Sequence, residues 1–454
     1  MKISGMIIII ILCVFGINQV GFAEVSAQEA QTLKTTLTPL GAEKAGNSDG
    51  TIPAWEGGYT TVAPGFKPGD KRPDPFAGEK PIIRINAGNL EKYKSKLAEG
   101  AQVMLKKYPE YYLEVYPSHR TASAPQYVYD NTFRNATHAK TIDNGLSVVG
   151  AYGGTPFPIP KNGNEAIYNH LFAWIGEAIY QPFRTYLVTT SGEIILASEA
   201  EQWLQSPYYY KDVPMEKWSG DLTELRLATT APAFKAGETI LAKDPADMQK
   251  GRQAWQYLVG QRRVRRAPSI AYDTPNQVTS GNTYWDEAFI FNGSLDRYDW
   301  KLIGKTEMYV PYNCNGYYLA PKDSDVLGTH FIKPDYVRWE LHRVWVVEAT
   351  LAPGKRHVVA KRRFYLDEDT WNALQEDGWD ANGQIWRYSY PLPLLSPDMP
   401  GIAGKVCSII YYNLQTGSYV SDNMLNEMRV QNEIISRKPE NFFTPEALAG
   451  SGIR

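Results

Sequence analysis

Strand-forming segments separated by turn residues fill most of the chain from residue 181 onward, and this pattern limits the folds open to it. Residues 181–197 predict a hairpin with Ser191 and Gly192 at its turn, and Pro353-Gly354-Lys355 predicts a second hairpin between two long strands. Further strands are expected at residues 252–266, 300–309, 336–351, 357–366, 385–390 and 406–414. Because strands joined by short turns pair antiparallel, we expect a large, curved antiparallel sheet in the α+β class.

A few segments break this strand pattern. A helix is expected at residues 90–108, because the apolar residues there fall on one helical face. A second helix is expected at residues 164–175, and a single helical turn at residues 369–375. The segments at residues 111–116 and 127–133, which are rich in tyrosine, predict short strands. We therefore expect a few helices packed on the sheet.

The first 23 residues have the features of a cleavable secretory signal. Lys2 is the only charge before Glu24, and an apolar run occupies residues 6–17. That run is about a dozen residues long, whereas a membrane-spanning helix needs about 20. Leu12 before Cys13 argues against a lipid anchor, since lipid attachment at a cysteine needs a small residue in front of it. We therefore expect a mature protein that is exported and unanchored.

The rest of the chain is expected to have three parts. Residues 24–81 are rich in Gly, Pro and Thr, and their spaced prolines prevent a continuous helix or a central strand. This segment is predicted to be an extended arm. Residues 82–440 are expected to form a single large domain, and residues 441–454 a C-terminal tail.

Charge and missing motifs exclude several classes of function. The formal net charge of −2 gives no basic footprint for nucleic acid. The sequence has no Gly-rich phosphate loop, no Gly-x-Ser-x-Gly elbow, no His-Glu-x-x-His and no Cys-x-x-Cys. We therefore expect no cofactor, and with so few thiols no metal site.

Two cysteines remain once the signal is removed, Cys314 and Cys407. In an oxidising compartment they can pair, and a disulfide that closes so long a loop would stabilise the fold by roughly 4 kcal/mol. The sequence does not show whether the two lie close together, so the disulfide is one of two alternatives.

Aromatic residues are unusually frequent, with 12 Trp, 30 Tyr and 15 Phe. Large side chains with a polar tip suit a sheet core, a ligand groove or a surface near a membrane. On a curved sheet the concave face is apolar, and four tryptophans are candidates to line it as a ligand site. These are Trp174, Trp300, Trp339 and Trp345. The same side chains can instead fill a core.

The segment 338–350 has the densest set of ionisable residues. With strand alternation, Arg338, Glu340 and His342 point to one face. Glu340 and His342 can then share a proton while Arg338 holds the carboxylate, which is the arrangement of a general base. The alternative is an ion-pair ladder matched by Lys361-Arg362-Arg363 on the partner strand.

A run of arginines stands near residue 264: Arg262, Arg263, Arg265 and Arg266. One interpretation is a rim that attracts anions such as lipid headgroups, or acidic partners. The alternative is that these are strand-end charges that pair with Asp296 or Asp299.

Four longer strings carry a family resemblance. They are Gly-Gly-Thr-Pro-Phe-Pro-Ile-Pro-Lys-Asn-Gly (153–163), Gly-Gln-Arg-Arg-Val-Arg-Arg-Ala-Pro (260–268), Arg-Tyr-Asp-Trp-Lys-Leu (297–302) and Glu-Leu-His-Arg-Val-Trp-Val-Val-Glu-Ala (340–349). Over residues 50–419 the chain resembles the Gram-negative family called domain of unknown function 1329. The resemblance implies a fold similar to LolA and LolB, an incomplete barrel with helices around an apolar cavity. It also implies a periplasmic location and, as partners, an RND-type exporter and an outer-membrane barrel protein. The family offers no catalytic residues to carry over, and Cys314 departs from its pattern.

The leading hypothesis is a periplasmic, non-enzymatic binding or carrier protein for a lipid, an acyl chain or a similar hydrophobic molecule. It would act in envelope transport with an exporter or an outer-membrane protein. One alternative is a hydrolase or isomerase that uses Glu340 and His342. Another is a structural adaptor of such a complex that holds no ligand.

Overall fold

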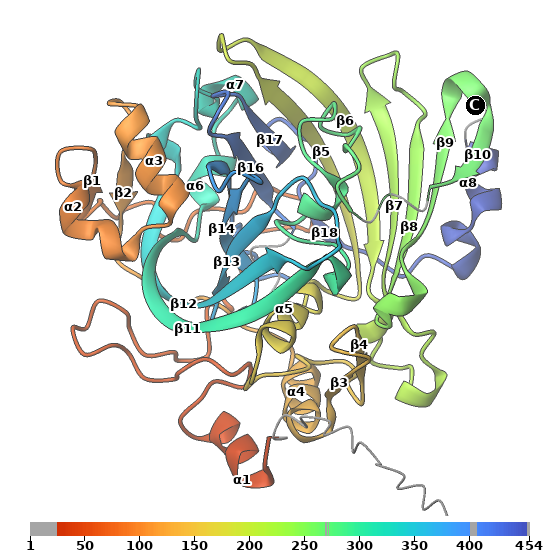
Figure 1. Ribbon diagram of the computed structural model, residues 1–454, viewed down its shortest axis with the longest axis horizontal. Helices are drawn as coiled ribbons and strands as arrows, with labels where there is room; N and C mark the ends of the chain where they lie inside the picture. The colour runs from red at the N-terminus through yellow and green to blue at the C-terminus, as the bar shows by residue number, and fades with distance from the viewer. Residues whose placement is uncertain (1–24, 268–269, 271, 400–405, 452–454) are drawn as a thin grey trace, which may run out of the picture.

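One sheet of 16 strands dominates the computed structural model, which describes residues 25–267, 270, 272–399 and 406–451 (Figure 1). The predicted signal at residues 1–23 lies outside the described residues. The strands are β1 (Ile83–Ile85), β2 (Leu113–Val115), β3 (Lys140–Ile142), β4 (Ser147–Val149), β5 (Ala178–Val188), β6 (Ile194–Gln205), β7 (Asp221–Ala231), β8 (Thr239–Pro245), β9 (Gln253–Leu258), β10 (Arg263–Arg266), β11 (Tyr298–Pro311), β12 (Arg338–Leu351), β13 (Lys361–Asp367), β14 (Ala373–Trp379), β15 (Ile385–Leu392), β16 (Ser408–Asn413), β17 (Tyr419–Met424) and β18 (Glu433–Ile434). β3 and β4 form a separate two-stranded sheet.

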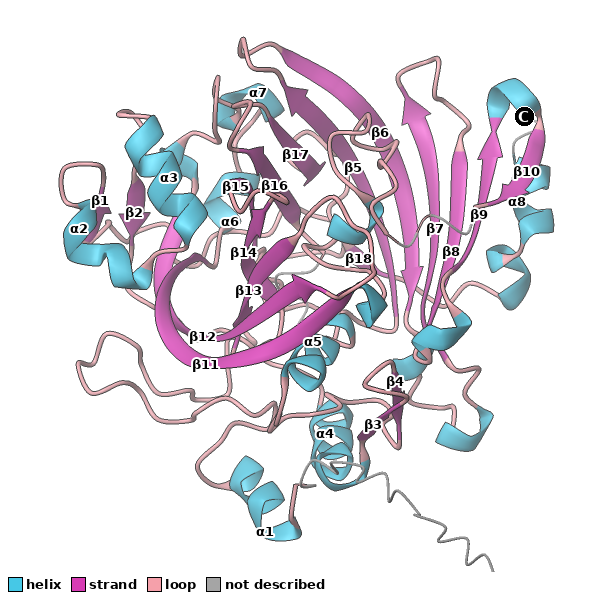
Figure 2. Ribbon diagram, viewed as in Figure 1, coloured by secondary structure: helices cyan, strands magenta, loops and turns pink. Residues whose placement is uncertain are grey.

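The large sheet is open rather than closed into a barrel. Its order is β1-β2-β12-β13-β14-β15-β16-β17-β5-β6-β7-β8-β9-β10, with β11 paired to β12 and β18 paired to β5. The pairing of β2 with β12 is parallel, and the other pairs are antiparallel. Register shifts interrupt several pairs, for example at Leu302/Gly304 in β11, and such bulges bend a strand and increase its twist. Figure 2 shows the result: β11 and β12 curve around one side of the molecule, and β5 to β10 form the other side of the sheet. The predicted fold class, a curved antiparallel sheet with few helices, is confirmed.

The helices are short and lie around this sheet. They are α1 (Ala27–Ala30), α2 (Leu90–Tyr93), α3 (Glu99–Lys107), α4 (Gln126–His138), α5 (Gly163–Leu171), α6 (Asn315–Tyr318), α7 (Asp323–Val326) and α8 (Pro445–Ser451). Within the described part of the chain, no helix has the length and the apolar character needed to span a membrane.

Both predicted hairpins are confirmed. β5 and β6 pair antiparallel around a turn at residues 189–192, and β12 and β13 pair around the turn at Pro353-Gly354. The segment 252–266 is not one strand, because a turn at residues 259–262 folds it into the hairpin of β9 and β10.

Three predictions for local structure were wrong. The segment 127–133 is helical, because its buried residues, such as Val128, Thr132 and Ala136, recur at helical spacing. The helix expected at residues 90–108 is broken at Leu97 and Ala98, which are extended. The turn expected at residues 369–375 is instead the entry to β14, and Trp371 there has a left-handed backbone with φ of 64°.

A side chain far along the sequence explains the broken helix. The Asp377 carboxylate on β14 accepts hydrogen bonds from the backbone N–H groups of Glu99 and Gly100, at 2.9 and 2.8 Å. It thereby caps α3 from outside, because the first N–H groups of a helix have no partner within it. A Cβ on Gly100 would lie 2.4 Å from the Tyr388 ring, so this close approach needs a glycine.

The large sheet is covered on both faces. On β16, Ile410 and Tyr412 belong to one apolar core, while their neighbours Ile409 and Tyr411 belong to a second one. Since alternate residues of a strand point to opposite faces, the two cores lie on opposite sides of the sheet. The first core also contains residues of α3 and α6, and the second contains residues of α5.

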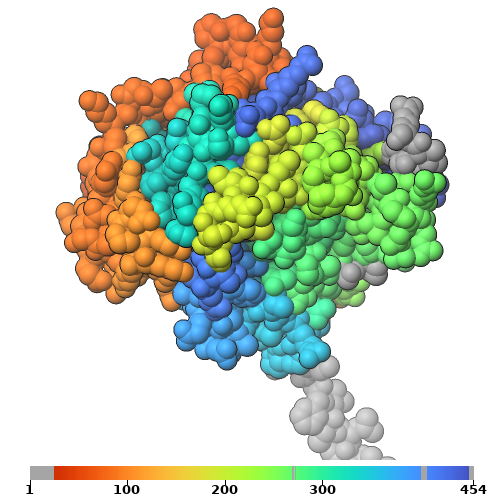
Figure 3. Space-filling model, turned by 90° about the horizontal axis from the view of Figure 1, so that it is seen from above, coloured from red at the N-terminus to blue at the C-terminus, as the bar shows by residue number. Residues whose placement is uncertain are grey.

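The predicted arm and the predicted tail both pack against the rest of the described chain. In the predicted arm, the Arg72 guanidinium is buried and donates to both oxygens of Asp398 at 2.7 Å. Gln431 N–H donates to the Gly69 carbonyl at 3.0 Å, and Figure 3 shows the orange-red arm beside this blue segment. In the predicted tail, Leu448 of α8 is buried against the sheet.

Candidate functional site

The first half of β12 carries a buried ionic cluster. Residues 338–343 are six consecutive buried positions, and four of them are Arg338, Glu340, His342 and Arg343. The other members of the cluster come from distant segments and are Glu79, His119, Arg120, Asp367, Glu368 and Asp369. We call this set the β12 cluster.

Glu340 is the centre of one half of the β12 cluster. Its Oε1 accepts from Arg338 Nε at 2.5 Å and from Asn313 Nδ2 at 3.0 Å. Its Oε2 accepts from the His119 N–H at 2.8 Å and contacts His342 Nε2 at 2.9 Å. Burial would raise the pKa of Glu340, but the contacts with His342 and Arg338 outweigh burial and lower it. With two partners on each oxygen, Glu340 has no free side to offer a substrate as a general base.

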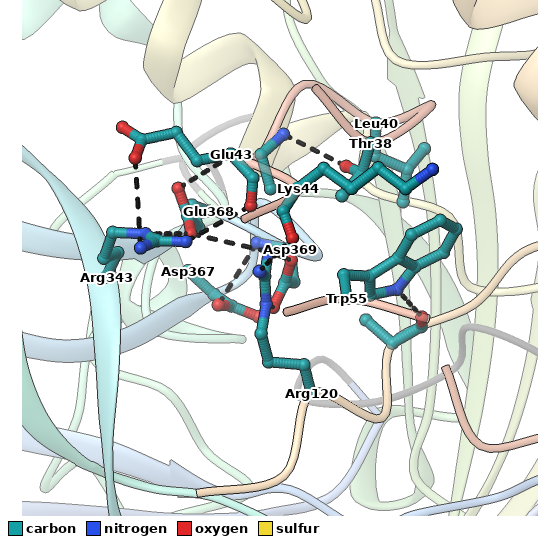
Figure 4. A network of polar contacts seen from close by, with 12 residues as sticks. Thr38, Leu40, Glu43, Lys44, Trp55, Arg120, Arg343, Asp367, Glu368 and Asp369 are labelled. Carbon is teal, nitrogen blue, oxygen red and sulfur yellow. Dashed lines mark hydrogen bonds and ion pairs between the residues drawn. The ribbon is translucent and has the colours of Figure 1, made fainter. Parts of the chain in front are cut away.

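The other half of the β12 cluster holds the arm (Figure 4). Arg120 donates to both oxygens of Asp369, at 2.9 and 2.6 Å, and Arg343 Nε donates to Glu368 at 2.6 Å. The same two arginines also donate to arm carbonyls, Arg120 to Lys44 at 3.3 Å and Arg343 to Ala45 at 2.6 Å. These charge-assisted hydrogen bonds fix the arm to the sheet.

His342, Asp367 and Asp369 lie close together inside the β12 cluster. One side-chain ligand atom of each lies within 4.8 Å of the others, and all three residues are buried. The Asp367 carboxylate accepts from the Tyr312 hydroxyl at 3.0 Å and the Thr370 hydroxyl at 2.7 Å. Burial, and then the charge of Asp369, raise the pKa of Asp367 to about 6. This is the set of described residues with the geometry to hold a metal ion.

The ion-pair ladder expected between β12 and β13 is present only near the far end of β12. There Glu348 pairs with Lys361 at 3.0 Å and with Arg363 at 2.9 Å. Glu340 and His342 lie beyond the end of β13, whose pairing covers residues 344–350 of β12.

Arg362 faces a second buried cluster rather than that ladder. It pairs with Asp286 at 2.8 Å and with Glu376 at 2.6 Å, and His357 Nε2 lies 2.9 Å from Asp286. Burial raises the pKa of Glu376 to about 7. All four side chains are almost fully excluded from solvent, so this cluster is part of the core.

An apolar pocket opens where β1, β2, β11 and β12 meet the arm. Its volume is about 300 Å³, at the lower end of the range for small-molecule sites. Its lining residues are Gly50, Thr51, Pro53, Ile82, Ile83, Val115, Tyr116, Pro117, Ser118, Tyr309 and Leu341. Ile82 is 62% exposed at its rim, whereas Leu341 and Val115 are buried. We call this the β1–β12 pocket.

The four predicted tryptophans do not meet in one cavity. Trp339 is buried in the first core, edge-on to Tyr390, and Trp174, Trp300 and Trp345 pack against the second core. Trp345 stacks on Trp371, and the Trp300 Nε1–H donates to the Leu295 carbonyl. None of the four is among the residues that line the β1–β12 pocket.

The four predicted arginines lie at the β9–β10 hairpin. All four are exposed, and none has an ion-pair partner within the part of the chain that the structure describes. The alternative, that these arginines pair with Asp296 or Asp299, is wrong for the described residues, because Asp296 contacts Arg297 and Lys355 and no ion pair joins Asp299 to any of the four. The neighbouring turn between β7 and β8 presents Phe234, which is 80% exposed, at the same end of the sheet, since Thr239 pairs with Tyr257.

Cys314 and Cys407 are free thiols in the structure rather than a disulfide, and both are buried. The Cys314 thiol approaches the carbonyl oxygens of Arg338 and Tyr312, at 3.5 and 3.6 Å. Burial raises the pKa of both thiols, that of Cys407 to about 12, so neither is a reactive thiolate.

The contacts of Glu340 with His342 and Arg338 were predicted from strand alternation, but those with Asn313 and His119 were not. Asp367, Glu368 and Asp369 form an acidic triplet that was not predicted as part of a site, and Arg120 lies more than 200 residues away from all of them. The β1–β12 pocket was also missed, because its walls come from five separate segments.

Comparisons with known proteins give one family and several distant structures. The family described as "Protein of unknown function (DUF1329)" matches residues 84–449. A protein of Pseudomonas aeruginosa, "Uncharacterized protein PA3922", is 40% identical over 443 residues, which is 95% of this chain and 95% of the relative.

Three solved structures to which the chain is similar are remote from it in sequence. A putative outer membrane lipoprotein-sorting protein domain from Vibrio parahaemolyticus is 15% identical and covers 61% of this chain and 92% of its own, with a TM-score of 0.41. A DUF1329 family protein from Desulfovibrio piger is 14% identical and covers 60% of this chain and 92% of its own, with a TM-score of 0.41. A LolA superfamily protein from Nitrosomonas europaea is 10% identical and covers 63% of this chain and 100% of its own, with a TM-score of 0.34.

Proposed function

This chain belongs to the DUF1329 family, as its four sequence strings predicted, and from that premise we propose that it is a non-enzymatic carrier of a hydrophobic ligand in the periplasm. The observation that supports the proposal is the β1–β12 pocket, which is mostly apolar and has an exposed isoleucine at its rim. Such a site binds by removing apolar surface from water, so an acyl chain or another lipid tail fits its chemistry.

A few polar groups at the pocket suit an amphipathic ligand. The lining includes the hydroxyl-bearing residues Thr51 and Ser118 and the exposed Gly50 next to them. An apolar tail between Ile83, Val115 and Leu341 would leave a polar head near these groups or in water. The ligand class is therefore a lipid or fatty acid rather than a fully apolar hydrocarbon.

The β9–β10 hairpin supplies a surface for transfer in this proposal. Four exposed arginines beside the exposed Phe234 suit contact with anionic headgroups, because arginine binds phosphate through two parallel hydrogen bonds. The exporter and the outer-membrane barrel protein inferred from the family remain proposed partners. The saturated contacts of Glu340 favour a carrier over the hydrolase or isomerase alternative.

The experiment combines lipid analysis with a variant that fills the pocket. Protein purified from the periplasm is extracted for mass spectrometry, and delipidated protein is titrated with a fluorescent fatty acid. We expect saturable binding that falls at least about tenfold in Ile83→Trp, because the indole occupies the apolar space. Ile194→Trp is the matched control, since Ile194 is 41% exposed at the start of β6, outside this pocket.

Two results would contradict the proposal. One is the absence of both a co-purified lipid and probe binding in the wild-type protein. The other is equal probe affinity in the Ile83→Trp and Ile194→Trp variants, which would place any ligand elsewhere.

A further inference from the structure

Three buried side chains of the β12 cluster lie close enough together to bind one ion. We infer that His342, Asp367 and Asp369 form a binding site for one Zn²⁺ ion, because their ligand atoms lie within 4.8 Å of one another in the buried interior. Zinc accepts both imidazole nitrogen and carboxylate oxygen as ligands. The small number of thiols argued against a metal site in the sequence, but this set needs none.

The contacts of His342 prepare it as a ligand. Its Nε2 lies 2.9 Å from the Glu340 carboxylate, and the neutral tautomer that this contact favours carries its proton on Nε2 and has a lone pair on Nδ1 for a metal. A carboxylate behind the imidazole is the usual outer partner of a metal-binding histidine. The Tyr312 ring stacks on the imidazole at 3.9 Å and fixes its plane.

The two aspartates leave a local excess of negative charge. Asp367 is buried and accepts hydrogen bonds from neutral hydroxyl groups, and no cationic side chain lies within 4 Å of it in the described chain. Arg120 binds Asp369, but it uses only one lone pair on each of the two oxygens. A buried carboxylate without a cation is costly, so a divalent ion at this point would stabilise the arrangement.

The geometry needs only a small contraction. Ligand atoms about 2.1 Å from a tetrahedral zinc ion lie about 3.4 Å from one another, so a pair at the 4.8 Å limit has to close by about 1.4 Å. Asp367 and Asp369 stand at the end of β13 and in the turn before β14, while His342 is on β12. The ion would therefore bind this turn to β12 at the place where Arg120 and Arg343 hold the arm, and its role is structural and independent of the carrier function.

The test measures zinc directly. Mature protein purified without chelators is examined by mass spectrometry for metals, and the metal-free protein is titrated with Zn²⁺ against a chromophoric chelator. We expect about one zinc per chain, its loss in His342→Gln and Asp367→Asn, and an affinity lowered about 10- to 100-fold in Glu340→Gln. His357→Gln is the control, because His357 is also buried beside a carboxylate but lies outside the site.

A second measurement covers variants that fail to fold. The melting temperature of the wild-type protein should fall when the zinc is removed and return when Zn²⁺ is added back. The inference is overturned if the wild-type protein carries no zinc and binds none on titration. It is also overturned if His342→Gln binds Zn²⁺ with the affinity of His357→Gln.

Discussion

Replacing Asp422 by asparagine should stabilise the protein at neutral and alkaline pH. Asp422 lies on β17, and its Oδ1 accepts from the Thr185 hydroxyl at 2.5 Å and from the Asn423 N–H at 2.9 Å. Within the described residues no cationic side chain pairs with it, and burial raises its pKa to about 6, from 3.8. An asparagine keeps the oxygen that accepts both hydrogen bonds and cannot ionise.

The magnitude follows from that shift in pKa. A raised carboxyl pKa means that ionisation opposes folding, so the destabilisation is absent below about pH 4, grows through pH 6 and is complete above about pH 7. The rise of the Asp422 pKa from 3.8 to about 6 corresponds to about 3 kcal/mol, which is an upper bound because Asp422 is 9% exposed. Asp422→Asn should therefore raise the free energy of unfolding by up to about 3 kcal/mol at pH 8 and change it little at pH 4.

The assay is urea unfolding, followed by tryptophan fluorescence, at pH 8 and at pH 4. Asp49→Asn is the matched control, because it removes an exposed carboxylate in the arm and should have no effect at either pH. If Asp422→Asn has the same effect at both pH values, or is destabilising at pH 8, the assignment of an uncompensated buried carboxylate is refuted.

Two further predictions concern charged side chains. Arg362→Gln should destabilise the protein by about 3–5 kcal/mol in urea unfolding, because it leaves Asp286 and Glu376 buried without their cation. The control is Arg363→Gln, which should cost less than about 1 kcal/mol because the Arg363 side chain is half-exposed. Equal effects of the two substitutions would contradict this. Changing Arg263, Arg265 and Arg266 together to glutamine should abolish co-sedimentation with vesicles of anionic lipid at low salt, without changing stability. The control is the same change at three exposed lysines, which should leave co-sedimentation intact: Lys106, Lys211 and Lys217. Unchanged sedimentation of the arginine variant would remove the proposed role of the hairpin.

Local patterns predicted those parts of the fold that depend on neighbours in sequence. The hairpin of β5 and β6 followed from a strand pattern around Ser191 and Gly192, and the contact of Glu340 with His342 followed from strand alternation. In contrast, the break before α3 depends on Asp377, 278 residues from Glu99. No pattern in the local sequence predicts that a carboxylate so far away will cap α3 and so mark where the helix begins.

The candidate site shows the same division. Arg338, Glu340 and His342 could be found on one strand, but the ion pair of Asp369 with Arg120 joins residues 249 positions apart. The segment of α4 was misassigned because its tyrosine, valine and phenylalanine residues favour strands, whereas its buried positions follow the helical period. In that segment, tertiary burial outweighed residue propensity.

The docking of the arm also sets an order of events for a newly made chain. The carbonyl of Ala45 is bound by Arg343, 298 residues later, and Arg72 is bound by Asp398, 326 residues later. The arm is thus synthesised early but is among the last segments to dock, because its partners are synthesised near the other end. Until these partners are made the arm has no site to dock on, and contacts between residues this far apart in sequence form slowly.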